Sequence, residues 1–143
     1  MLRNIHYILT ILLLTCCTNT ERKFAQDFII INEGFTPTIN QIDKANSKLL
    51  NYLETKTKNG ETIYINSLDG KVSLQDQLKY YKRRYIGKKT TEGEQIIRIE
   101  FVFVRCGGQD EWKKIQYTKD GAKDCWWSVL YNADRDEVYS LTL

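Results

Sequence analysis

A chain of 143 residues in which 42% of the side chains are hydrophobic and 27% are charged has the composition of a globular protein, which excludes a disordered body. Its 21 basic and 18 acidic residues leave a formal net charge of +3, which is too even a balance to indicate a polyanion, so we expect no nucleic-acid partner. A chain of this length forms one domain that buries roughly two-thirds of the surface exposed by the unfolded chain.

The first residues have the layout of a secretory signal. A basic residue, Arg3, precedes an apolar run from Tyr7 to Leu14, and small residues and cysteines follow. A membrane-spanning helix needs about 20 apolar residues, and this run is much shorter. The sequence therefore favours an export signal over a permanent membrane span.

The segment Leu14-Thr15-Cys16-Cys17 resembles the lipobox of bacterial lipoproteins, in which cleavage precedes a cysteine that is diacylated on sulfur. The resemblance implies lipidation of Cys17, with Cys16 as the alternative because Gly, Ala or Ser usually precedes the cut. It also implies export to the bacterial cell envelope, on the periplasmic side or at the cell surface, and anchoring to a membrane through the N-terminal lipid. The expected organisation is a signal peptide at 1–16, a tether at 17–26 and a single domain at 27–143. An ordinary cleaved signal with incidental cysteines is the competing interpretation.

Histidine is almost absent from this chain. The one histidine, His6, lies in the expected signal peptide. A body without histidine has no Ser-His-Asp triad, no Cys-His pair and no histidine-containing zinc site. Carboxylates, tyrosines and lysines remain, but no two of them stand at a spacing diagnostic of catalysis. We therefore expect a protein that is not an enzyme and that uses neither a cofactor nor a metal.

The first half of the body is predicted to be largely helical. Phe28 to Ile31 is an apolar run that fits either an edge strand or the start of a helix. After Pro37, Thr38 and Gln41 form a capping box, and a helix is expected from Ile39 to about Lys56. Its apolar stripe consists of Ile39, Ile42, Ala45, Asn46, Leu49 and Leu53.

A short strand and a second helix follow in the prediction. Residues 62–66 alternate as in a strand, and Ser73 is the expected N-cap of a short helix whose face carries Leu74, Leu78 and Tyr81. The next strand, Tyr85 to Lys89, is expected to turn as a hairpin into the strand that follows it.

The run from Gln95 to Arg105 has the strongest strand pattern in the chain and is expected at the centre of the sheet. Its odd-numbered residues, Ile97, Ile99, Phe101 and Phe103, are expected to pack against the long helix. Further strands are predicted at 112–118, 125–131 and 138–143, separated by turns.

These elements predict an α+β fold, in which N-terminal helices pack on a four- to five-stranded antiparallel meander. The order of elements is similar to that of cystatin-like and NTF2-like rolls. This similarity concerns element order only, because neither family's motifs are present.

Cys106 and Cys125 form a candidate disulfide, since an even pair of cysteines in an exported body favours a bridge. If the predicted strand 112–118 lay between the strands that carry them, two spacings of about 4.8 Å would keep the cysteines too far apart. The sequence alone therefore does not decide whether Cys106 and Cys125 form a disulfide.

Two groups of residues are candidates for a binding surface. Trp126 and Trp127 are adjacent and must point to opposite faces of their strand, so one is core and the other, Trp126, is a candidate ligand contact. A second group interleaves basic and aromatic residues, which suits an anionic ligand: Arg83, Arg84, Tyr85, Lys88 and Lys89. For both groups the competing interpretation is structural. In it Trp126 is covered by a helix or by edge packing, and the basic residues form a solvated helix end and hairpin whose tyrosines pack inward.

Asn132, Asp134 and Asp136 alternate like calcium ligands, but the required glycine is missing, and we interpret the segment as a hairpin turn. The sequence favours a small lipid-anchored envelope protein that binds a partner protein or an envelope polymer without catalysis. The alternatives are a roll with a small-molecule pocket, acting as a carrier or an enzyme, and a structural envelope subunit.

Overall fold

The computed structural model describes residues 28–67, 70–103, 111–113 and 125–143. The predicted signal peptide and tether, together with Cys16 and Cys17, lie outside these residues. In chain order the elements are β1 (Phe28–Asn32), α1 (Ile39–Lys58), β2 (Tyr64–Ser67), β3 (Gly70–Ser73), α2 (Leu74–Gln77), η2 (Leu78–Tyr80), β4 (Tyr81–Lys89), β5 (Gln95–Phe103), η3 (Glu111–Lys113), β6 (Trp126–Asn132) and β7 (Glu137–Thr142).

Five strands form one sheet in the order β1-β4-β5-β6-β7, so the run with the strongest strand pattern is central, as predicted. The strands β4 to β7 are an antiparallel meander. The expectation of a purely antiparallel sheet is wrong, because β1 lies parallel to β4, with Ile30 opposite Tyr85. The reason is the connection: the chain leaves β1, crosses through α1, and returns to enter β4 in the same direction.

The long helix begins where the sequence predicts. The Thr38 side chain accepts a hydrogen bond from the backbone of Gln41, and the Gln41 side chain accepts one from the backbone of Thr38, which completes the capping box. The buried residues of α1 are the predicted stripe, Ile42, Ala45, Asn46, Leu49 and Leu53. Ile39 is the exception, because it lies at the first turn and remains exposed.

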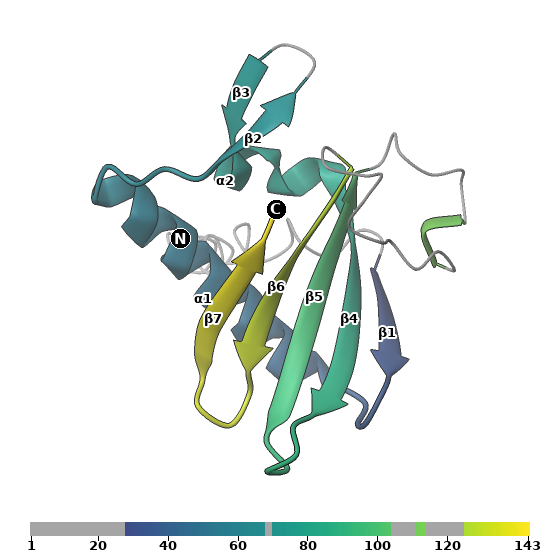
Figure 1. Ribbon diagram of the computed structural model, residues 1–143. Coiled ribbons are helices and arrows are strands. Elements are labelled where there is room, and N and C mark those ends of the chain that lie inside the picture. Colours follow the sequence, from purple (N-terminus) through teal and green to yellow (C-terminus); the bar gives the residue numbers. More distant parts are fainter. Residues whose placement is uncertain (1–27, 68–69, 104–110, 114–124) are drawn as a thin grey trace, which may run out of the picture.

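α1 packs on one face of the sheet, and the hydrophobic core fills the space between them (Figure 1). The odd-numbered residues Ile97, Ile99 and Phe101 of β5 are fully buried there, as predicted. Trp127 stacks on Phe101 with ring centroids 3.7 Å apart and planes 2° from parallel. Trp127 is thus the tryptophan that belongs to the core, beside Val129 and Tyr131.

The second helix is shorter than predicted. α2 spans four residues, and Ser73 makes no side-chain capping bond. Tyr81, which the sequence pattern places on the face of this helix, is instead the first residue of β4 and lies opposite Phe103. Pairing along the whole of β5 therefore outweighs the weak helical pattern, and β4 begins four residues earlier than expected. The predicted strand at 62–66 is found as β2, which pairs with β3 in a separate two-stranded hairpin.

The strand predicted at 112–118 is not found where the structure describes this segment. Trp112 and Lys113 lie in the 3₁₀ turn η3, and residues 114–118 lie outside the described residues. β6 pairs directly with β5, with Phe101 opposite Trp127. No strand therefore separates β5 from β6, although the alternation of residues 112–118 suggested one.

Candidate functional site

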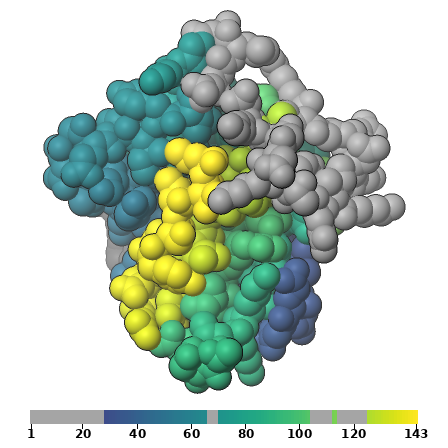
Figure 2. All heavy atoms as spheres, viewed as in Figure 1, coloured from purple at the N-terminus to yellow at the C-terminus, as the bar shows by residue number. Residues whose placement is uncertain are grey.

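The face of the sheet turned away from α1 carries an open groove of about 520 Å³. Figure 1 is viewed from this side, with α1 crossing behind the strands, and Figure 2 shows the same face in space-filling form. The groove crosses β4, β5, β6 and β7, and its lining combines three apolar side chains, three cations and four hydroxyl-bearing side chains: Ile96, Trp126, Leu130; Lys88, Lys89, Arg98; Thr90, Ser128, Tyr139, Thr142.

Strand alternation brings these side chains together. In β5 the odd positions enter the core, so Ile96 and Arg98 point to the groove. Arg98 lies opposite Leu130, and cross-strand partners share a face. Tyr139 joins them because the β6–β7 register shifts between Leu130 and Tyr131, which leaves residue 139 as the extra residue of a bulge. About half of the Tyr139 side chain (49%) remains exposed.

Charges on this face are arranged as linked pairs. Glu100 Oε1 lies 3.0 Å from Arg98 Nη2, and Glu100 Oε2 lies 3.4 Å from Arg84 Nε. Lys88 Nζ lies 2.8 Å from Glu33. The Lys88 hydrogen bond holds the pKa of Glu33 below its ordinary value, so this carboxylate is ionised at neutral pH. Among the groove-lining residues that the structure describes, Lys88, Lys89 and Arg98 are cations and none is a carboxylate.

Two hydrogen-bond donors of the groove lack an acceptor. Trp126 Nε1 and Arg98 Nε are buried, and neither meets a hydrogen-bond acceptor within the part of the chain that the structure describes. A buried donor without a partner costs about 1–3 kcal/mol. Both atoms are covered by neighbouring atoms, so they mark uncompensated polar groups beneath the groove surface.

The groove collects three of the six predicted binding-surface residues. Trp126, Lys88 and Lys89 all line it. Trp126 is half-buried, so the expectation that one tryptophan of the pair lies on the face away from the core is correct.

The other three predicted surface residues are placed differently. The expectation that Arg83 and Arg84 are exposed is wrong, whereas the burial of Tyr85 agrees with the interpretation in which the tyrosines of this segment pack inward. Tyr85 and Arg83 project into the core side of the sheet, with 1% and 4% of their surface exposed. Arg84 lies on the groove side of the sheet, but only 7% of its surface is exposed and its guanidinium forms an ion pair with Glu100. The sequence pattern predicts an exposed basic hairpin here. In the structure β4 lies between β1 and β5, and the middle residues of β4 are therefore buried.

Arg83 and Tyr85 form part of a polar interior. Arg83 Nη2 donates to the carbonyl oxygen of Leu78 at 3.2 Å, and its guanidinium lies 5.7 Å from the ring centre of Phe101. The Tyr85 hydroxyl donates to Asn46 Oδ1 of α1 at 2.9 Å. Burial raises the pKa of Tyr85 and lowers that of Arg83. The Tyr85–Asn46 hydrogen bond joins α1 to the sheet, and neither Arg83 nor Tyr85 is accessible to a large ligand.

Cys125 is disulfide-bonded. Its carbonyl oxygen accepts a hydrogen bond from the Phe103 amide at 2.8 Å, so it lies beside the end of β5. Because β5 and β6 are direct neighbours, the objection that a strand separates the two cysteines no longer applies. Cys106 lies outside the described residues, and its pairing with Cys125 stays a prediction.

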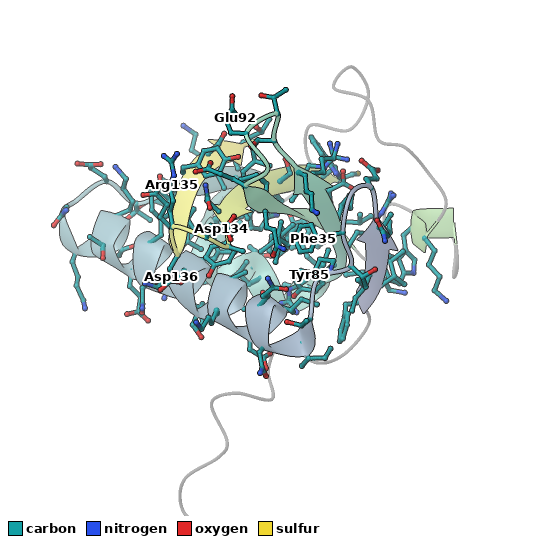
Figure 3. The ribbon with its side chains drawn as sticks, turned by 90° about the horizontal axis from the view of Figure 1, so that it is seen from below. Phe35, Tyr85, Glu92, Asp134, Arg135 and Asp136 are labelled. Atoms are coloured by element: carbon teal, nitrogen blue, oxygen red, sulfur yellow. The ribbon has the colours of Figure 1, made fainter. Side chains whose placement is uncertain are left out.

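The acidic segment at residues 132–136 is a hairpin turn, as predicted. Figure 3 shows Asp134, Arg135 and Asp136 at this turn, with Asp136 on the side of α1. Each carboxylate is engaged within the fold: Asp134 accepts from the Gln95 amide, and Asp136 accepts from the Tyr131 hydroxyl and pairs with Lys48. Within the described residues, no group of three or more His, Cys, Asp or Glu is placed to hold a metal ion.

Sequence reasoning missed Arg98, Leu130 and Tyr139 as groove residues. A signal existed for the first two, since they occupy the positions of β5 and β6 that alternate with the core residues. None existed for Tyr139, because its position depends on a bulge that no residue pattern marks.

Across the described part of the chain, no helix is both long and apolar enough to cross a membrane. Comparison of the chain with protein-family models, with curated proteins and with solved structures gave no match.

Proposed function

We propose that this protein is a small lipid-anchored domain of the bacterial cell envelope that binds a partner protein or an envelope polymer, without catalysis, through the groove on the face of the sheet away from α1. The observation that carries the proposal is the groove itself: an open site in which Trp126 and two aliphatic side chains lie among cations and hydroxyl groups. Ligand sites are typically apolar clefts with a few polar groups that fix orientation.

A solvent-facing antiparallel sheet usually alternates core residues with purely polar ones. Here the positions that face away from α1 include Trp126, Ile96 and Leu130, which lie in one connected groove and are not scattered singly. Aromatic side chains in such grooves are frequent anchors for binding partners. This departure from the usual pattern supports a binding role over a purely structural one.

The envelope location rests on the sequence resemblance to lipoproteins. Mass spectrometry of the protein purified from membranes is expected to find a diacylated or triacylated cysteine at the mature N-terminus, at Cys17 or Cys16. A mature chain that is unmodified and released from membranes contradicts the anchoring part of the proposal and leaves the groove unaffected.

Site-specific photo-crosslinking in cells tests the binding role. A photoreactive residue in place of Tyr139, at the groove, is compared with one in place of Tyr64 on the separate β2–β3 hairpin. The two tyrosines are matched controls, because they are 49% and 54% exposed. We expect a discrete adduct from position 139 alone.

The same experiment needs a variant that blocks the groove. Leu130→Glu replaces an apolar side chain of the groove with a carboxylate opposite Arg98, which removes apolar contact and pairs with this cation, and it should abolish the adduct. Equal adducts from both positions, no adduct at 139, or an adduct that persists in Leu130→Glu at unchanged stability overturns the binding role.

A carrier or enzyme built on a pocket inside the roll has less support. The space between α1 and the sheet, where such a pocket would lie, is occupied by tightly buried side chains including Leu49, Ile99 and Val129.

A further inference from the structure

We infer that the ligand of the groove is an acidic polysaccharide: a chain of sugar rings carrying carboxylate groups. This inference rests on the proposed binding function and narrows it to one chemical class. It follows from the shape of the groove, from the three kinds of side chain in its lining, and from the path it takes across the sheet.

The groove suits an extended chain. It reaches from β4 to β7, and four adjacent strands span three spacings of about 4.8 Å, or about 14 Å in all. A site of this length and of about 520 Å³ is open along the surface. It can hold several linked units of a polymer that continues beyond both ends.

The lining matches the chemistry of a sugar ring. Trp126 and Tyr139 present aromatic surface, on which the C–H face of a sugar packs while its hydroxyl groups stay free. Thr90, Ser128 and Thr142 add hydroxyl groups that both donate and accept hydrogen bonds. A ligand rich in hydroxyl groups can use all of these contacts, whereas a purely apolar ligand would leave them unsatisfied.

The charge of the groove selects an acidic sugar. Lys88, Lys89 and Arg98 line it, and no carboxylate side chain is among its lining residues in the described part of the chain. Arg98 lines the same groove as Trp126, and the ion pair that joins it to Glu100 runs through Nη2 at 3.0 Å. Guanidinium groups bind carboxylates with good geometry.

A peptide fits this site less well. An extended peptide gains affinity by adding its main chain to the edge of a sheet. The groove instead lies across the face of the sheet, where β4, β5 and β6 are already paired on both sides and only β7 has a free edge. Over most of the groove a protein partner would therefore meet side chains and no unpaired main chain.

Isothermal titration of the detergent-solubilised full-length protein tests the inference with three compounds of similar length: oligogalacturonate, neutral maltohexaose and linear polyphosphate. We expect oligogalacturonate to bind at least 10-fold more tightly than either of the others. Raising the salt concentration should weaken its binding, because the attraction between the charges is screened.

Variants locate the binding in the groove. Arg98→Gln and Tyr139→Ala should each weaken oligogalacturonate binding about 10-fold, and Leu130→Glu should abolish it. Lys58→Ala, which removes an exposed cation at the end of α1, is the matched control and should have no effect. Urea denaturation of each variant separates lost binding from lost folding.

Three results would overturn the inference. Equal binding of maltohexaose shows that the cations play no part, and equal binding of polyphosphate shows a site for anions in general. If no oligosaccharide binds while the Tyr139 cross-link to a protein persists and Leu130→Glu removes it, the polysaccharide is excluded and the proposed binding role stands. If the cross-link fails as well, both are wrong.

Discussion

At Gly87 in β4, the loop that leads into α1 lies so close that no side chain fits. A Cβ atom there would stand 2.2 Å from the carbonyl oxygen of Phe35 and 2.7 Å from Pro37 Cδ. The carbonyl oxygen of Gly87 also accepts hydrogen bonds from the amides of Glu33 and Phe35, at 3.0 and 3.4 Å. This one residue therefore fixes the path from β1 into α1.

Gly87→Ala should lower the free energy of unfolding by about 3 kcal/mol, because the overlap is with backbone and cannot be relieved by a side-chain rotation. Gly93→Ala is the comparison: its φ of +88° disfavours alanine, but nothing lies within 4 Å of the new Cβ, so the loss should be about 1 kcal/mol. Urea denaturation measures both. A Gly87→Ala variant as stable as the native protein would show that the loop moves freely.

Asp136 links α1 to the β6–β7 turn. The hydrogen bond from Lys48 and then that from Tyr131 hold the pKa of Asp136 below its ordinary value of 3.8. A carboxyl whose pKa is depressed in the folded state adds stability above its unfolded pKa, and this stability is lost as the pH falls through the folded pKa.

Asp136→Asn should therefore be less stable than the native protein at pH 6, and the difference should shrink below about pH 4, where the unfolded carboxyl is protonated. Asparagine tolerates the positive φ of 55° at this position, so backbone strain does not confuse the comparison. Thermal denaturation at pH 6 and pH 3 measures the effect. A difference that is the same at both pH values would rule out an electrostatic contribution.

Among the elements, α1 is the one whose sequence signals and structure agree most closely. Its capping box satisfies backbone donors that the helix itself leaves unpaired. Thr38→Ala should therefore cost about 1 kcal/mol of stability. Ser47→Ala, at an exposed position within the same helix, is the control and should cost nothing, because alanine has the higher helix propensity. Chemical denaturation of the two variants side by side checks this, and equal stabilities would refute the role of the cap.

The strands were predicted unevenly, for a physical reason. In β5 every odd-numbered residue from Ile97 to Phe103 is apolar, and such a period of two is a local property that a sequence displays directly. The extent of β4 depends on its partners, because residues 81–84 pair with Glu100 to Phe103 and two of them also pair with β1. The parallel pairing of β1 likewise depends on where α1 returns the chain, which no local pattern encodes.

At the scale of the whole molecule, Cys125 is disulfide-bonded immediately before β6. If its partner is Cys106, the loop has about 20 residues and the bridge should add about 3 kcal/mol by restricting the unfolded chain. Peptide mapping without reductant should recover the two cysteines in one cross-linked species, and reduction should lower the stability by about that amount. Alkylation of a free thiol at either cysteine in the native protein would contradict the pairing.

The sequence by itself determined the α+β class, the position and stripe of α1, the central place of β5 and the division of Trp126 and Trp127 between two faces. Each of these follows from a period of 3.6 or of two, which neighbouring residues set among themselves. Only the tertiary structure decided which strands are adjacent, that Arg83 and Arg84 are buried, and that Arg98, Leu130 and Tyr139 meet Trp126 in one groove. The reason is that a charged side chain is buried only where a partner from another element arrives, as Glu100 of β5 does for Arg84 of β4, and such meetings depend on contacts between residues far apart in the chain.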